Sequence, residues 1–281
     1  MRIMNRLFLI LVLVLLIGCE GNPVRKPSVI ENAGRYSQDA IQAYDDEQWI
    51  LAKHLFNRAL RLYQGVDDQE GVLATHINLV EVALSAHDYQ EAKHYLNWLN
   101  NNAKDQGQRV VLLNALFALQ QKKMTEATVF LQQLLPKFDG DNLLVSLDGI
   151  QLTAVATQTK VAFAQKQDEA LWVSRYAHAL KKVNNKDEVR KALLYRFRSR
   201  LLVSQGEYAA AANKLQQVLL IYKKHQVRQG IAMTLFELGA LSEMQNDREE
   251  ALAYFNRSIA VFKYLKDEGM VRNISNKLEL Y

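Results

Sequence analysis

The 281-residue sequence predicts an all-α protein, a solenoid of about six antiparallel helix pairs that ends in a C-terminal capping helix. Helix-breaking residues are scarce, because only three prolines are present and, after Pro27, only Pro136 could interrupt a helix. A small alanine also recurs every 35 to 43 residues, a spacing found in helical solenoids. These alanines are Ala52, Ala92, Ala127, Ala170, Ala211 and Ala251.

The segment Gly230–Ala260 shows the repeated unit most clearly. On both sides of a polar hinge at 245–247, apolar residues recur at spacings of three and four, as on two amphipathic helices. The hinge contains an asparagine and an aspartate, which favour the start of a helix. The small Gly239 and Ala251 would allow the two helices to approach closely, and Phe255 would fill the space beside them.

This segment resembles the tetratricopeptide repeat. The residues that carry the resemblance are Leu238-Gly239, Asn246-Asp247, Ala251 and Phe255. The spacing of about forty residues resembles the variety found in bacterial transcriptional activators and animal polarity scaffolds. Over about residues 30–280, the resemblance implies a right-handed superhelix in which the first helix of each pair lines a concave groove.

The same pattern assigns the remaining helices. The expected pairs are Ile30–Tyr44 with Gln48–Tyr63, Gln69–Ala86 with Tyr89–Ala103, Gly107–Gln121 with Thr125–Leu135, Leu143–Gln165 with Asp168–Val183, and Asp187–Ser204 with Tyr208–Lys224. The fourth pair matches worst, since Ser174 stands four residues after Ala170, where a phenylalanine is expected. Residues 137–142 are expected to form a loop. Gly71, Gly230 and Gly269 are each expected to open a first helix, the last of them in the capping helix.

The first eighteen residues have the features of a lipoprotein signal peptide. Arg2 and Arg6 precede the apolar run Leu7–Ile17, which is shorter than the roughly twenty residues that a membrane-spanning helix needs. The residues that follow, Gly18-Cys19, end a segment that resembles the bacterial lipobox. The resemblance implies that Cys19 becomes the lipidated first residue of the mature protein, held in a membrane by its acyl chains. An ordinary signal peptide with an incidental cysteine is the alternative.

Residues 19–29 are expected to form a flexible tether, because they mix glycine, proline, serine and charged residues. The solenoid is then expected over residues 30–281. Under the enterobacterial sorting rule, an aspartate at the second mature position retains a lipoprotein in the inner membrane. Since Glu20 occupies that position, we expect the periplasmic leaflet of the outer membrane.

Catalytic and metal-binding patterns are absent from the sequence. The six histidines are scattered without an HExxH motif, and Cys19 is the single cysteine, so no metal site is predicted. No nucleophile elbow, phosphate-binding loop or dinucleotide fingerprint occurs, so we expect neither an enzyme nor a cofactor. Without Arg2 and Arg6 the sequence holds 33 basic and 30 acidic residues, and this balance of about +3 does not indicate a polyanion partner. A periplasmic address also argues against nucleic acid.

A candidate binding site lies in the basic stretch from Lys181 to Arg200. Arg196 and Arg200 are four residues apart, hence on one helix face, and are expected to point into the groove. Two guanidinium groups there would suit a carboxylate, a phosphate or an acidic peptide. Positions counted from the recurring alanine of each repeat place Met233, Phe236 and Met244 inward, where they would form an adaptable apolar surface for a peptide. The alternatives are a solvated helix face for the arginines and packing against a neighbouring helix for the apolar residues.

The function predicted from these features is that of a lipid-anchored scaffold. It would bind a protein or peptide partner of the periplasm or outer membrane in its groove. Resemblance to envelope lipoproteins built from these repeats implies a role in cell-envelope assembly, of outer-membrane proteins, pili, secretion channels or the cell wall. The second hypothesis is a binding module for a small anionic ligand or a cell-wall fragment, with Arg196 and Arg200 as its contacts.

Overall fold

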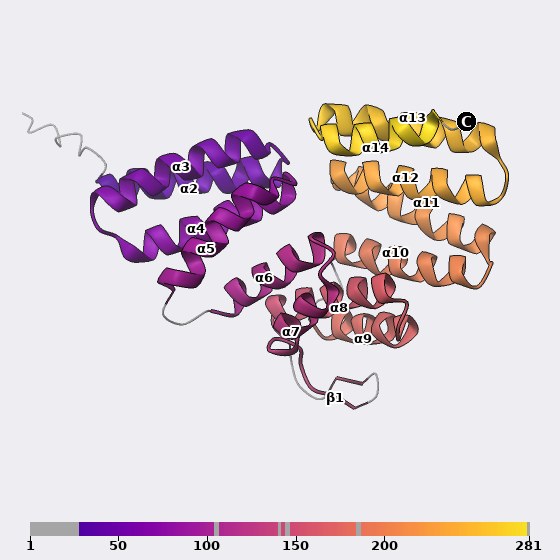
Figure 1. The fold of residues 1–281 in the computed structure, drawn as a ribbon, viewed down its shortest axis with the longest axis horizontal. Coiled ribbons are helices and arrows are strands. Elements are labelled where there is room, and N and C mark those ends of the chain that lie inside the picture. Colours follow the sequence, from indigo (N-terminus) through magenta and orange to yellow (C-terminus); the bar gives the residue numbers. More distant parts are fainter. Residues whose placement is uncertain (1–27, 104–106, 140–141, 144–146, 184–186, 280–281) are drawn as a thin grey trace, which may run out of the picture.

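The computed structural model describes residues 28–103, 107–139, 142–143, 147–183 and 187–279, and these fold into thirteen α-helices and one short hairpin (Figure 1). The predicted signal peptide and Cys19 lie outside the described residues. The helices are α2 (Val29–Asp45), α3 (Trp49–Gly65), α4 (Gln69–Ser85), α5 (Tyr89–Asn102), α6 (Gln108–Gln120), α7 (Met124–Gln132), α8 (Gly149–Gln165), α9 (Glu169–Val183), α10 (Glu188–Ser204), α11 (Tyr208–Lys224), α12 (Arg228–Met244), α13 (Arg248–Tyr264) and α14 (Glu268–Leu278).

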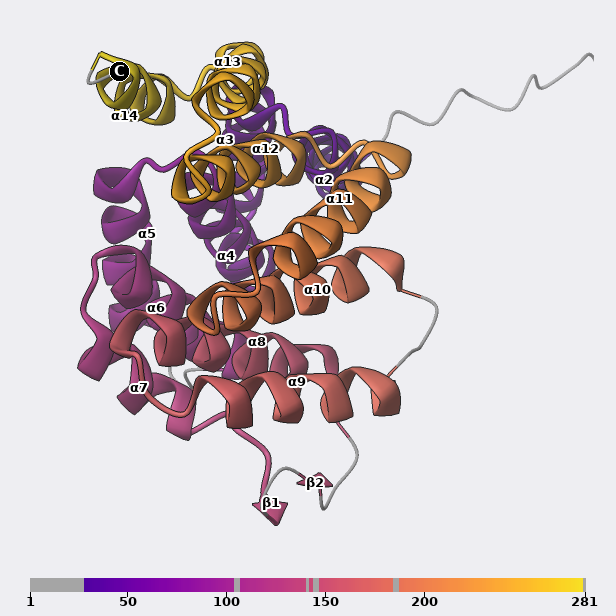
Figure 2. The same ribbon diagram turned by 90° about the vertical axis from the view of Figure 1, so that its right-hand side faces the viewer.

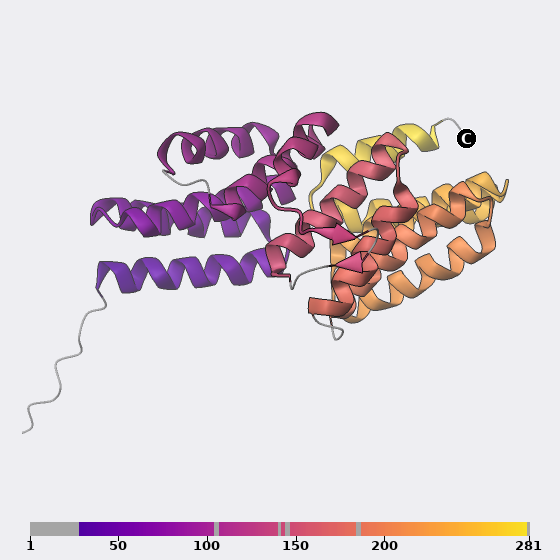
Figure 3. The ribbon, with the colours of Figure 1, turned by 90° about the horizontal axis from the view of Figure 1, so that it is seen from below.

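Successive helices form six antiparallel pairs, from α2–α3 to α12–α13, and α14 packs against the last pair. Each pair packs mainly against the pairs next to it in the chain, as in a solenoid (Figures 1 and 3). The predicted all-α solenoid of six pairs with a C-terminal helix is therefore confirmed for the described part of the chain.

The turns between helices follow one recurring design. Nine connections between described helices are three residues long, and in eight of them the middle residue has a left-handed backbone with φ between 54° and 79°. These middle residues are Glu47, Asp67, His87, Lys122, Gly206, Gln226, Asn246 and Lys266. In four of the connections an aspartate follows and caps the next helix by accepting a hydrogen bond from its third backbone N–H.

The fourth pair begins later than predicted. In place of the expected loop and first turn, β1 (Phe138–Asp139) pairs antiparallel with β2 (Asn142–Leu143). Helix α8 starts only at Gly149, where Asp148 and Gln151 form a reciprocal capping box. The hairpin and the cap together delay the helix by six residues relative to the predicted start at Leu143.

Small residues allow the two helices of a pair to approach closely. The predicted alanines Ala52, Ala92, Ala127, Ala211 and Ala251 have no exposed surface. A Cβ atom added to Gly239 would lie 2.8 Å from the ring of Phe255 and 3.2 Å from the carbonyl oxygen of Ala251, so only glycine fits there. The rings of Tyr63 and Tyr222 occupy the corresponding space at Gly71 and Gly230. Gly269 differs, since the nearest atom to a Cβ there is a side-chain oxygen of Asp267, at 3.4 Å.

The predicted register of the fourth pair is wrong by two residues. Ala170 is exposed on α9 rather than buried against α8. Tyr176, Ala179 and Leu180 are buried with the spacing of Phe56, Ala59 and Leu60 in α3, which places Trp172 at the position of the small alanine. The larger Trp172 is half-buried there, and Tyr176 rather than Ser174 fills the core.

Ala251→Trp is expected to lower the free energy of unfolding by about 1–3 kcal/mol or more, because a buried position with no free volume must accept an indole. Thermal and urea denaturation followed by circular dichroism would measure the change. Ala170→Trp makes the same substitution at an exposed alanine and is expected to have little effect. Equal losses in the two variants would contradict the register described here.

Candidate functional site

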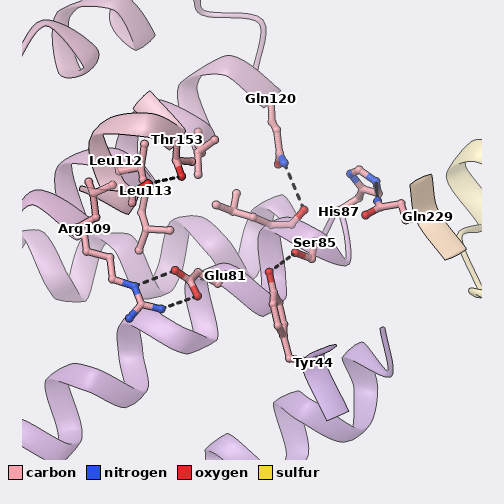
Figure 4. A pocket seen from close by; sticks show the side chains of 14 residues that line it. Tyr44, Glu81, Ser85, His87, Arg109, Leu112, Leu113, Gln120, Thr153 and Gln229 are labelled. Atoms are coloured by element: carbon pink, nitrogen blue, oxygen red, sulfur yellow. Dashed lines mark hydrogen bonds and ion pairs between the residues drawn. The ribbon is translucent and has the colours of Figure 1, made fainter. Parts of the chain in front are cut away.

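Residues of the first helices supply most of the lining of two cavities. We call the side of the solenoid formed by these first helices the channel. A cavity of about 440 Å³, the first cavity, opens at its N-terminal end (Figure 4). Its lining comes from α2, α4, α6 and α8, with Gln229 of α12 added from the far end of the chain. Leu112 and Leu116, two leucines of the predicted groove helix α6, are part of this lining.

Polar contacts in the first cavity connect neighbouring first helices (Figure 4). The Tyr44 hydroxyl lies 3.0 Å from the Ser85 hydroxyl, and burial raises the pKa of Tyr44. Arg109 donates two hydrogen bonds to the carboxylate of Glu81, at 2.9 and 2.8 Å. The charges of Arg109 and Glu81 therefore balance one another, and the first cavity offers apolar and neutral polar surface to a ligand.

The second cavity, of about 320 Å³, lies at the C-terminal end of the channel and brings together three of the predicted site residues. Arg200, Phe236 and Met244 line it, together with Phe163 of α8. Met244 is 55% exposed, an unusual exposure for a large apolar side chain. Met233 and Phe236 both pack against the buried core of α12 and α13, in agreement with the alternative interpretation, and Met233 does not line the second cavity.

Arg196 is held by an acidic partner that the sequence did not reveal. Its Nε and Nη2 atoms donate to the two carboxylate oxygens of Glu237 at 2.9 and 2.8 Å, and only 15% of its side chain is exposed. Arg200 Nη2 donates to the same carboxylate at 2.9 Å and is 43% exposed. Arg196 and Arg200 do share a helix face, but Arg196 is a structural contact between α10 and α12.

The Arg196–Glu237 pair stabilises the fold in its charged form. Burial disfavours the ionised carboxylate of Glu237, yet the attraction of Arg196 and then of Arg200 outweighs burial and lowers the pKa of Glu237. The stabilisation is thus present at neutral pH and lost as the pH falls through this lowered pKa. Removing Arg196 alone would leave the buried Glu237 carboxylate with Arg200 as its partner. Loss of one member of a buried ion pair lowers the free energy of unfolding by about 3–5 kcal/mol.

Lys160 of α8 supplies the charge that the sequence interpretation missed. It follows Thr153 of the first cavity by seven residues and precedes Phe163 of the second by three, so all three share one face of α8. Lys160 keeps exposed surface, while neighbouring protein atoms crowd around its ammonium group. This crowding, and then the charges of Arg196 and Arg200, lower the pKa of Lys160 to about 8. The helical spacing places Lys160 on this face, but Lys160 is a lone lysine outside the basic stretch 181–200.

The two ends of the solenoid meet and close the channel on itself (Figures 1 and 2). The Glu47 carboxylate accepts hydrogen bonds from the backbone N–H of Gln229, at 3.0 and 3.2 Å, in the first turn of α12. The N-cap residue of α12, Val227, has an apolar side chain that cannot accept a hydrogen bond from the first turn of the helix. Glu47, from the first helix pair, caps α12 in its place. Arg228 also donates to the Asp46 carbonyl oxygen at 2.9 Å. Burial raises the pKa of Glu47 despite these bonds and the nearby charge of Arg228.

Among known proteins, the chain is similar in structure to some solved proteins. No protein-family model and no curated protein matches the sequence. A structure from a functional characterisation of Pseudomonas aeruginosa PilF aligns with a TM-score of 0.45 and 16% identity, over 89% of this chain and 99% of that one. BtubC (BKLC) from P. vanneervenii aligns with a TM-score of 0.45 and 14% identity, over 86% and 93%. Neither likeness assigns a function, and the fit to a tetratricopeptide-like repeat rests on the helix pairs described above.

Glu47→Gln is expected to weaken the contact between the two ends while keeping the shape of the side chain. The loss of a charged acceptor at a helix N-terminus should cost about 0.5–2 kcal/mol. Hydrogen exchange should therefore accelerate at the amides of the first turn of α12. Asp39→Asn, on the exposed side of α2, removes the same charge and serves as control. Unchanged exchange in Glu47→Gln would show that the ends are not joined in solution.

Proposed function

We propose that this chain is a lipid-anchored scaffold that binds a protein or peptide partner in its channel and takes part in assembling the bacterial cell envelope. The observation that carries the proposal is the channel itself, lined by first helices and holding two cavities with apolar surface. Concave, largely preformed surfaces with a few placed polar groups are typical binding sites. The exposed Met244 favours a peptide, because methionine adapts its shape to varied apolar side chains.

The address of the protein rests on its first thirty residues. The lipobox-like segment before Cys19 supports acylation, and Glu20 favours the periplasmic leaflet of the outer membrane. Within the part of the chain that the structure describes, no helix has the length and apolar character needed to cross a membrane. We therefore place the partner among periplasmic or outer-membrane proteins and exclude nucleic acid from the proposal.

A binding module for a small anion or cell-wall fragment is the second candidate. The hypothesis drawn from the sequence uses Arg196 and Arg200, but Arg196 is only 15% exposed and is bound to Glu237. Lys160 and the more exposed Arg200, which also donates to Glu237, are the cations that such a ligand could reach. Such a ligand would need no apolar contact, which separates this candidate from the peptide-binding one.

Photo-crosslinking would test the proposed binding face. A benzoylphenylalanine at Met244, inside the channel, is expected to crosslink a protein of the envelope. The same group at Leu220, which is 68% exposed on the second helix α11, serves as matched control and should give no specific product. Equal crosslinking from both positions would place the partner elsewhere on the surface. No protein product from Met244 would favour the small-anion candidate.

Cys19→Ser is expected to abolish metabolic labelling of the protein with radioactive palmitate, because a hydroxyl group cannot take the place of the acylated thiol. Gly18→Ala keeps a small residue before the cysteine and should remain labelled. Labelling of the serine variant, or a mature N-terminus at another residue, would refute the proposed anchor.

A further inference from the structure

The C-terminal end of the channel carries an excess of positive charge. Arg196 and Arg200 share the carboxylate of Glu237 there. Arg200 also lies over the ring of Phe163, which follows Lys160 by about one turn of α8, so Lys160 is the third cation of this cluster. Glu237 already accepts three hydrogen bonds from the two arginines. Among the described residues, no carboxylate forms an ion pair with Lys160. The cluster therefore has a net charge of +2 and one exposed cation without a counter-charge.

Apolar surface adjoins this cluster. Arg200 lies over the ring of Phe163, 5.9 Å from its centroid, and both residues line the second cavity with Phe236 and Met244. A ligand that reached Lys160 and Arg200 with a negative group would thus meet an apolar cavity beside it. Inorganic anions have no group that could use this cavity, whereas a peptide offers both kinds of side chain.

The spacing along α8 indicates how a peptide would lie. With a rise of about 1.5 Å per residue, Lys160 is roughly 10 Å from Thr153 of the first cavity and roughly 4.5 Å from Phe163 of the second. An extended chain advances about 3.3 Å per residue. Lys160 therefore faces the middle of a peptide that runs along the channel, about three residues from the first cavity and one or two from the second.

We propose that the channel recognises an internal acidic residue of its partner. The carboxylate of this residue lies between Lys160 and Arg200, and an apolar residue one or two positions away enters the second cavity at Phe163, Phe236 and Met244. This inference rests on the proposed function, since it specifies the partner of the same channel. Charge-assisted hydrogen bonds from Lys160 and Arg200, shielded by the channel walls, would provide the selectivity for an acidic over a neutral residue.

An array of N-acetylated, C-amidated twelve-residue peptides would test the proposal on the full-length protein in detergent. The peptides place Glu, Gln or Lys at the centre and Leu, Phe or Ser one to five positions away. Because the termini are blocked, only internal carboxylates can contribute. The strongest binders should contain Glu with Leu or Phe one or two positions away, and Glu→Gln in the best peptide should raise Kd at least about tenfold.

Variants of the protein assign this preference to the channel. Lys160→Glu should raise Kd for the Glu peptide at least about tenfold and favour the Lys peptide instead. Lys160→Gln, which adds no new charge, should reduce the preference for Glu over Gln to the part that Arg200 supplies. Lys93→Glu makes the same charge reversal on the exposed face of α5 and should change Kd less than about twofold. Met244→Gln should raise Kd for the peptides that contain Leu or Phe and leave Kd unchanged for those that contain Ser.

Several results would overturn the proposal. An array without preference for Glu, or equal effects of Lys160→Glu and Lys93→Glu, would show that the cluster does not select acidic residues. Competition by millimolar inorganic phosphate, with no effect of Met244→Gln, would assign the cluster to a small anion. If these results appeared while Met244 still crosslinked an envelope protein, the acidic preference would be wrong and the scaffold function would stand. If the peptide array showed no preference for Glu and Met244 also crosslinked no envelope protein, both the acidic preference and the scaffold function would be refuted.

Discussion

Close approach of paired helices is the constraint on which this structure depends. Each pair in a solenoid buries its apolar faces only against its neighbours, so the distance between helices decides how much surface leaves water. Gly239, Ala251 and Phe255 set that distance in the last pair, and buried alanines do so in four others. The fourth pair departs from the rule, with Trp172 at the small position and the β1–β2 hairpin before it. The channel changes character there, from the neutral first cavity to the cationic second one.

Most of the fold could be predicted from the sequence because its signals are local. Scarce prolines, polar three-residue hinges and helical periodicity each depend on residues close together in the chain. The register of the fourth pair could not be predicted in this way. Ala170 and Trp172 are only two residues apart, and a search for a small residue selects Ala170, whereas burial of Tyr176 requires Trp172 at that position. Gly269 opens α14 as predicted, although no aromatic ring lies against it as one does at Gly71 and Gly230.

The candidate site was only partly predictable, because its decisive contacts join different pairs. Periodicity correctly placed Arg200, Phe236 and Met244 beside one another. It could not show that Glu237, 41 residues after Arg196, binds that guanidinium and removes it from the surface. Nor could a search for basic clusters find Lys160, a single lysine made important by arginines that lie 36 and 40 residues further along the chain. The net charge of the channel is the sum of the positive and negative side chains that neighbouring helices contribute. The sequence of one helix alone does not give this sum.

The contact between Glu47 and Gln229 changes how a repeat protein of this kind should unfold. In an open array, stability is nearly a sum over neighbouring units, and the terminal units fray independently. Here the first and last pairs protect one another through a contact that spans 182 residues. Fraying of either end would break this contact as well, so loss of structure becomes more cooperative. The same contact can form only after the sixth pair has been made, and such a distant contact is slow to close. The N-terminal pair is synthesised first, but it can reach its full stability only after the sixth pair has been synthesised and has folded.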